Sequence, residues 1–133
     1  MAKYYLNPLN FSNPKAASFL SAFKLTPTED TVANMLVVAA ESNDFVEPTV
    51  AANTLAAAEI VATSLGRPST DFPIELLEIV HGALPALEGC KILASDAISI
   101  VMDSVQDSVA MQDEANDFAS WEEAQQNLLH RLT

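Results

Sequence analysis

An alanine-rich segment that opens with a proline and closes with a glycine constrains the fold of this chain more than any other feature. Pro48 opens the segment and Gly66 closes it, and these residue types favour the first turn and the end of a helix. Apolar residues recur inside it at spacings of four and three: Ala51, Leu55, Ala58, Ala62 and Leu65. Because alanine side chains let neighbouring helices approach closely, we expect this helix to be buried at the centre of the fold.

Further helix signals divide the rest of the chain. The predicted helix starts are Asn13 and Pro14, Thr28 followed by two acids, Pro73, a point near Ala86, and a capping box from Ser120 to Glu123. No segment shows the period-two alternation of a strand. We therefore predict an all-α protein, a single compact bundle of five to seven helices that spans residues 1–133 as one domain.

Composition excludes several kinds of protein. The single cysteine, Cys90, allows no internal disulfide, and three glycines are too few for a phosphate-binding loop. The first residues lack the apolar core of a secretory signal, and no apolar run approaches the length of a membrane span. Six scattered bases form no nucleic-acid patch. We expect a cytoplasmic protein that binds no cofactor, no nucleic acid and no membrane.

The charge of the chain is strongly negative and unevenly distributed. The formal net charge is −12, and the region between Lys91 and Arg131 holds eight acids and no lysine or arginine. Asp96, Asp103, Asp107 and Glu114 follow one another at spacings of seven, four and seven, so one continuous helix would carry them along one side. A break near residues 106–108, with Ser108 as a new cap, would disperse them.

The ordinary alternative for this acidic region is a solvated helix face. Such faces usually mix both signs, because oppositely charged neighbours attract and like charges repel. An acidic region without bases therefore indicates a cationic protein partner. We predict that the partner-binding residues are Asp103, Asp107, Asp113, Glu114 and Asp117. The acids Glu41, Asp44 and Glu47 form a second patch of the same sign that we expect to serve as a control.

Motifs for chemistry are weak in this chain. Glu78 and His81 have the spacing of a di-iron ligand pair, but the matching second pair is missing, so we predict no metal site. The acids at Asp113 and Asp117 lack the glycine and glutamate of a calcium loop. An enzyme that uses Glu78, His81 and Cys90 is the weakest alternative, and we predict no catalytic residues.

Glu59 is out of place among the alanines of the predicted central helix. A carboxylate there must either face solvent or be paired with a basic or backbone group. We expect a partnered, partly buried carboxylate with a structural role. Arg67 and the N-terminal segment are the candidate partners.

Three segments resemble a bacterial domain family of uncharacterised function, made of short, acidic, helical proteins. At the start, Phe11, Asn13, Ala16 and Phe19 fit the pattern of the family, whereas its tryptophan and glycines are missing here. The other two segments are residues 56–62 followed by 66–68, and residues 113–132. The resemblance covers most of the chain and supplies no catalytic residues.

Small acidic proteins of this kind resemble immunity proteins of bacterial toxin systems, including contact-dependent growth inhibition. The resemblance implies an immunity protein that binds and neutralises a basic nuclease toxin, expected to be a ribonuclease, by covering its active site with an acidic helical face. This agrees with the charge, since a protein that holds phosphates is basic. The alternative is a non-catalytic interaction or regulatory module, in which the chain forms a homodimer.

Overall fold

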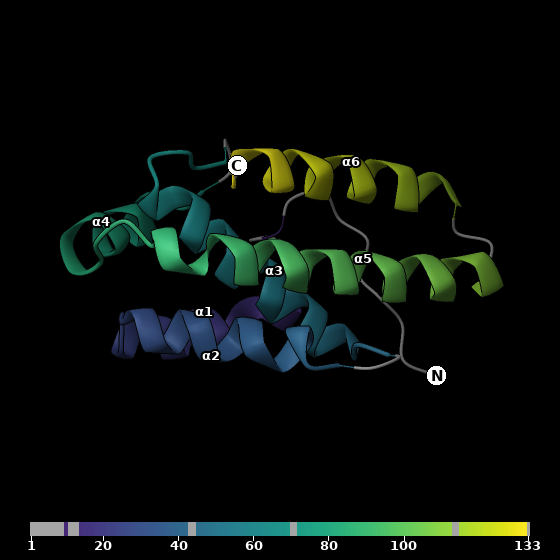
Figure 1. Ribbon diagram of the computed structural model, residues 1–133, viewed down its shortest axis with the longest axis horizontal. Coiled ribbons are helices and arrows are strands. Elements are labelled where there is room, and N and C mark those ends of the chain that lie inside the picture. The colour runs from purple at the N-terminus through teal and green to yellow at the C-terminus, as the bar shows by residue number, and fades with distance from the viewer. Residues whose placement is uncertain (1–9, 11–13, 43–44, 70–71, 113–114, 133) are drawn as a thin grey trace.

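Helix α3 (Pro48–Ser64) lies at the centre of the molecule, and helices from both halves of the chain pack against it (Figure 1). The computed structural model describes residues 10, 14–42, 45–69, 72–112 and 115–132, with the side chains of Pro14 and of 108–118 excepted. Every residue from 51 to 63 is buried. Pro48 occupies the first turn, and Gly66 follows the helix with a φ of 85°, a conformation that glycine adopts without strain. The prediction of a buried, alanine-rich central helix is confirmed.

Two N-terminal helices pack against one side of α3. The short turn η2 (Pro14–Ala16) leads into α1 (Ala17–Leu25), and α2 (Glu29–Ala40) follows. Thr28 caps α2 as predicted, because its hydroxyl accepts a hydrogen bond of 3.3 Å from the backbone N–H of Thr31. Apolar side chains at helical spacing form the core here: Phe19, Phe23, Val32, Leu36 and Ala39.

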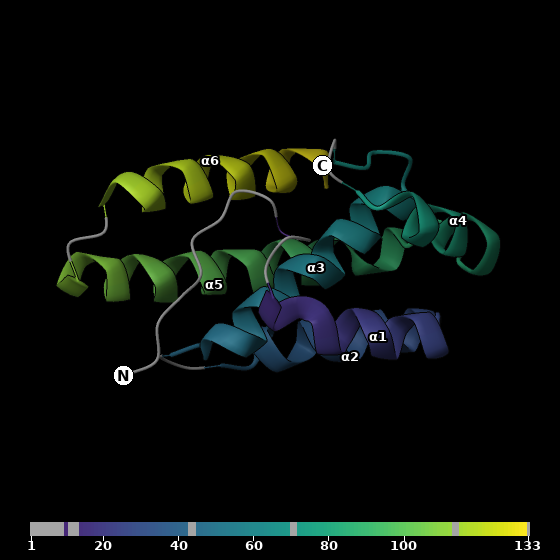
Figure 2. The same cartoon turned by 180° about the vertical axis from the view of Figure 1, so that it is seen from behind.

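The second half of the chain supplies α4 (Ile74–Ala83), the turn η3 (Glu88–Cys90), α5 (Lys91–Gln112) and α6 (Ala115–Arg131). Helix α5 lies across α3, and α6 runs beside α5 in the opposite direction (Figures 1 and 2). Buried residues recur along α5 and α6: Ala94, Ala97, Ile98, Val101, Val105, Trp121 and Leu128. The described residues thus form six α-helices and contain no strand, as predicted.

Two predicted helix boundaries are wrong. Helix α5 starts at Lys91 rather than near Ala86. The chain is extended at Leu84, and the N–H of Leu87 donates to the hydroxyl of Ser64 at 3.0 Å rather than to a backbone carbonyl of a helix. Helix α6 is already helical from Ala115, so Ser120 lies inside it and does not cap it. Each added turn contributes further backbone hydrogen bonds, which outweigh a local capping preference.

Within the described part of the chain, no helix is both long and apolar enough to cross a bilayer.

Candidate functional site

Helix α5 presents a row of carboxylates to solvent. It is continuous from Lys91 to Gln112, so the break considered near residues 106–108 does not occur. Asp96, Asp103 and Asp107 are all exposed, and their spacings of seven and four put them on one side of the helix. We call these three residues the acidic face. Among the residues that the structure describes, none of the three forms an ion pair.

The other predicted binding residues cannot be assigned to this face. Asp113 and Glu114 lie outside the described residues, and for Asp117 only the backbone, within α6, is described. Glu123 is exposed on α6, the helix that runs beside α5 (Figure 1). The helix beside α5 therefore also carries an exposed acid.

Three of the bases, Lys91, Arg67 and Arg131, are engaged elsewhere. Lys91 forms an exposed ion pair with Glu88 at 3.4 Å, one turn back on the same stretch of chain. Arg131 is largely buried against Glu59, and Arg67 bonds to the backbone of Arg131. The acidic face thus keeps its charge, which a cationic partner would neutralise.

A buried hydrogen bond holds the connection between α2 and α3 against α5. The hydroxyl of Ser104 accepts a bond of 2.9 Å from the backbone N–H of Val46, and both residues are buried. Ser104 follows Asp103 directly and precedes Asp107 by one turn. The exposed neighbours of Val46, Phe45 and Glu47, therefore belong to a segment that is held against α5.

Replacing Ser104 with alanine should lower the free energy of unfolding by about 1–3 kcal/mol, because a buried N–H loses a hydrogen-bond partner. Urea unfolding measures this loss, and amide exchange of Val46 should become faster. Ser99→Ala is the control, since Ser99 is exposed and its hydroxyl donates to the carbonyl oxygen of Ser95 in its own helix. Unchanged exchange at Val46 would show that the Ser104 hydroxyl does not hold the connection.

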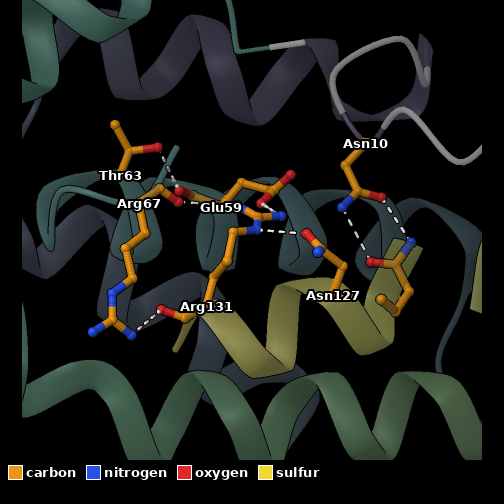
Figure 3. A network of polar contacts seen from close by, with 7 residues as sticks. Asn10, Glu59, Thr63, Arg67, Asn127 and Arg131 are labelled. Carbon is orange, nitrogen blue, oxygen red and sulfur yellow. Dashed lines mark hydrogen bonds and ion pairs between the residues drawn. The ribbon is translucent and has the colours of Figure 1, made fainter. Parts of the chain in front are cut away.

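A second polar feature lies inside the bundle, between α3 and α6 (Figure 3). Glu59 is only 2% exposed, and its Oε1 lies 2.7 Å from Nη2 of Arg131. The Nε of the same guanidinium donates to Oδ1 of Asn127 at 2.8 Å. The expectation of a partnered carboxylate is confirmed, although the carboxylate is more deeply buried than predicted, and the ion-pair partner among the described residues is Arg131 rather than Arg67.

Arg67 and Arg131 each donate a hydrogen bond from the side chain to the backbone carbonyl of the other. Nη1 of Arg67 donates to the carbonyl oxygen of Arg131 at 3.2 Å, and Nη1 of Arg131 donates to that of Arg67 at 3.1 Å. Arg67 follows Gly66 directly after α3, while Arg131 ends α6 (Figure 3). These contacts fix the last turn of α6 on the end of α3, so Arg67 positions the partner of Glu59.

A pair of amide side chains ties the N-terminal segment to α6. Asn10 donates to Gln125 at 3.1 Å and accepts from it at 3.0 Å, and both side chains are buried (Figure 3). Such a reciprocal pair satisfies two buried amides at once. The sequence holds one signal for this pair, a glutamine one helical turn after Trp121 on the apolar side of α6.

The residues of the weakest alternative, an enzyme, are not brought together by any hydrogen bond or ion pair that the structure describes. Glu78 and His81 are exposed on α4, whereas Cys90 is buried in η3. Burial, and secondarily the charge of Glu29, raises the pKa of the Cys90 thiol. The thiol is therefore protonated near neutral pH, where a nucleophile would need the thiolate. The described residues also contain no group of His, Cys, Asp and Glu side chains suited to a metal ion.

Comparison with known proteins gives one match. The model of a family described as a domain of unknown function (DUF4259) matches residues 7–124. No curated protein and no solved structure shows a significant match. The matched range includes α1 to α5 and the acidic face, and it stops before Arg131.

Proposed function

The chain belongs to this family of unknown function, DUF4259, and we propose that it is an immunity protein that binds and neutralises a basic nuclease toxin, expected to be a ribonuclease. The toxin would be its partner in the cytoplasm, and inhibition would need no chemistry and no cofactor. The acidic face would occupy the phosphate-binding site of the toxin and exclude RNA from it.

The observation that carries this proposal is the unpaired charge of α5. Asp96, Asp103 and Asp107 are exposed on one side of a continuous helix, and none of them forms an ion pair among the described residues. Like charges on one helix face repel and lower stability. A basic partner would remove this repulsion on binding, and a row of carboxylates resembles the charge pattern of a nucleic-acid backbone.

Exposed charge of this kind acts mainly on the rate at which the two proteins associate. Complementary fields raise association rate constants by about 10- to 1,000-fold at low salt, and screening reduces the effect beyond a Debye length of about 8 Å at physiological salt. With a net charge of −12, the chain should attract basic proteins and repel nucleic acids and anionic membranes. Specificity would come from the shape of the surface.

Neutralising two residues of the acidic face, Asp103→Asn with Asp107→Asn, should lower the association rate constant for the toxin about 3- to 10-fold and reduce its salt dependence. The dissociation rate constant should change less, because both side chains are exposed. The partner is first captured at low salt from cells that carry the gene, identified and purified. Surface plasmon resonance at several salt concentrations then measures both rate constants.

Glu75→Gln with Glu78→Gln is the matched control. Both residues are exposed on α4, which lies far from the C-terminal half of α5 (Figure 1). The control changes the net charge by the same amount. Because its charges lie outside the proposed contact surface, the association rate constant should stay within about two-fold of that of the wild type. An equal loss in both double variants would mean that only the overall charge matters and that the acidic face is not the binding surface.

The alternative function is an interaction module that forms a homodimer. It is favoured by large apolar side chains that remain exposed: Leu25, Ile74 and Ile92. Light scattering coupled to size exclusion separates the two functions. A stable dimer that Ile92→Ala dissociates, in the absence of any basic partner, would support the module.

A further inference from the structure

One large apolar side chain, Phe45, is exposed in the segment that is held against α5. Phe45 is 50% exposed, although its neighbour Val46 is buried and bonded to Ser104 of α5 at 2.9 Å. The backbone at this position is therefore anchored beside α5, and the ring extends from a fixed point. An aromatic side chain in this position offers a rigid surface at a low cost in conformational entropy.

Exposed carboxylates lie near this anchor point along the chain and on α5. Glu47 is exposed two residues after Phe45, and Asp103 and Asp107 flank Ser104 on α5. Charged rims steer partners, whereas the energy of an interface is concentrated in a few desolvated aromatic or arginine contacts. The acids alone would give fast but weak binding, and the ring supplies the contact that slows dissociation.

The aromatic ring and the carboxylates together favour one kind of partner side chain. An aromatic face attracts a guanidinium group through its π electrons, and carboxylates receive the same group in two parallel hydrogen bonds. Lysine fits less well, because its ammonium is a compact and strongly hydrated charge. A surface that combines a ring with nearby carboxylates therefore favours arginine.

We propose that Phe45 is the apolar anchor of the binding surface and that the partner segment seated on it is basic and carries an arginine, which stacks on the ring while Asp103, Asp107 and Glu47 receive its charge. This rests on the proposed function, since it specifies what the acidic face recognises. It adds a contact that acts on the lifetime of the complex.

The test uses oligo-arginine and oligo-lysine peptides of equal length, titrated against the full chain by calorimetry and by NMR. The wild type should bind oligo-arginine about three- to five-fold more tightly than oligo-lysine, as expected for one exposed cation–π contact. Signals of the Phe45 ring should shift with oligo-arginine. Phe45→Leu keeps an apolar side chain without a ring, and it should bring the two affinities to within about 1.5-fold of each other.

Ile92→Ala is the control, because Ile92 is an exposed apolar residue on the same helix, roughly 18 Å from Ser104 along the axis. It should leave the arginine preference unchanged. If the preference for arginine survives Phe45→Leu, while Asp103→Asn with Asp107→Asn still weakens the binding of both peptides, Phe45 is not the anchor and the proposed function stands. If neither peptide binds, or the Asp103 and Asp107 changes have no effect on binding, both proposals are overturned.

Discussion

Replacing Glu59 with glutamine should lower the free energy of unfolding by about 3–5 kcal/mol, the usual loss when one partner of a buried ion pair is removed. For a chain of this size, the melting temperature should fall by about 10–15 °C. The effect is large because both side chains are shielded from water: Arg131 is 15% exposed and Glu59 3%. Glutamine keeps the shape of the side chain but leaves the guanidinium buried without its countercharge.

Thermal unfolding followed by circular dichroism measures this effect. Glu78→Gln is the control, because Glu78 is exposed on α4 and its substitution should change the free energy of unfolding by no more than about 0.5 kcal/mol. Replacing both partners, Glu59→Met with Arg131→Met, should recover much of the loss, since an apolar pair needs no countercharge. An unchanged melting temperature for Glu59→Gln would contradict a structural role for the pair.

Replacing Ala58 with leucine should cost about 1–3 kcal/mol or more. Ala58 is fully buried in α3, the central helix of the bundle. The three added carbon atoms must displace a helix or adopt a strained conformation. Because the residue is apolar in both cases, the loss would report on space alone.

Urea unfolding measures this cost. Ala22→Leu makes the same chemical change at an exposed position of α1, and it should alter the free energy of unfolding by less than about 0.5 kcal/mol. Equal stability of the Ala58 and Ala22 variants would show that α3 has room around it and that small residues are not required there.

Much of the fold follows from local signals. Pro48 and Gly66 mark the bounds of α3 correctly, and Thr28 caps α2, because both signals depend on backbone groups within one turn. The start of α5 was missed since a contact with Ser64, more than twenty residues earlier, holds Leu87 outside the helix. Ser120 has a good capping pattern, but α6 begins earlier.

The polar contacts depend on tertiary structure, and the sequence predicts them only in part. A carboxylate among alanines indicates that Glu59 needs a partner, but Arg131 lies at the other end of the chain and only the fold brings it near. The pair of Asn10 and Gln125 joins residues 115 positions apart. By contrast, the exposure of Asp103 and Asp107 could be predicted, because helical periodicity alone places them opposite the apolar side of α5.

The central claim is that the acidic face binds and blocks a nuclease, and a titration of RNA cleavage tests it most directly. Purified toxin cleaves a fluorescent RNA while increasing amounts of the protein are added, at low and at physiological salt. The wild type should abolish cleavage at equimolar amounts, and the Asp103→Asn, Asp107→Asn variant should need a several-fold excess at physiological salt. Cleavage that continues in excess wild type, or equal inhibition by the variant at both salt concentrations, would contradict the claim.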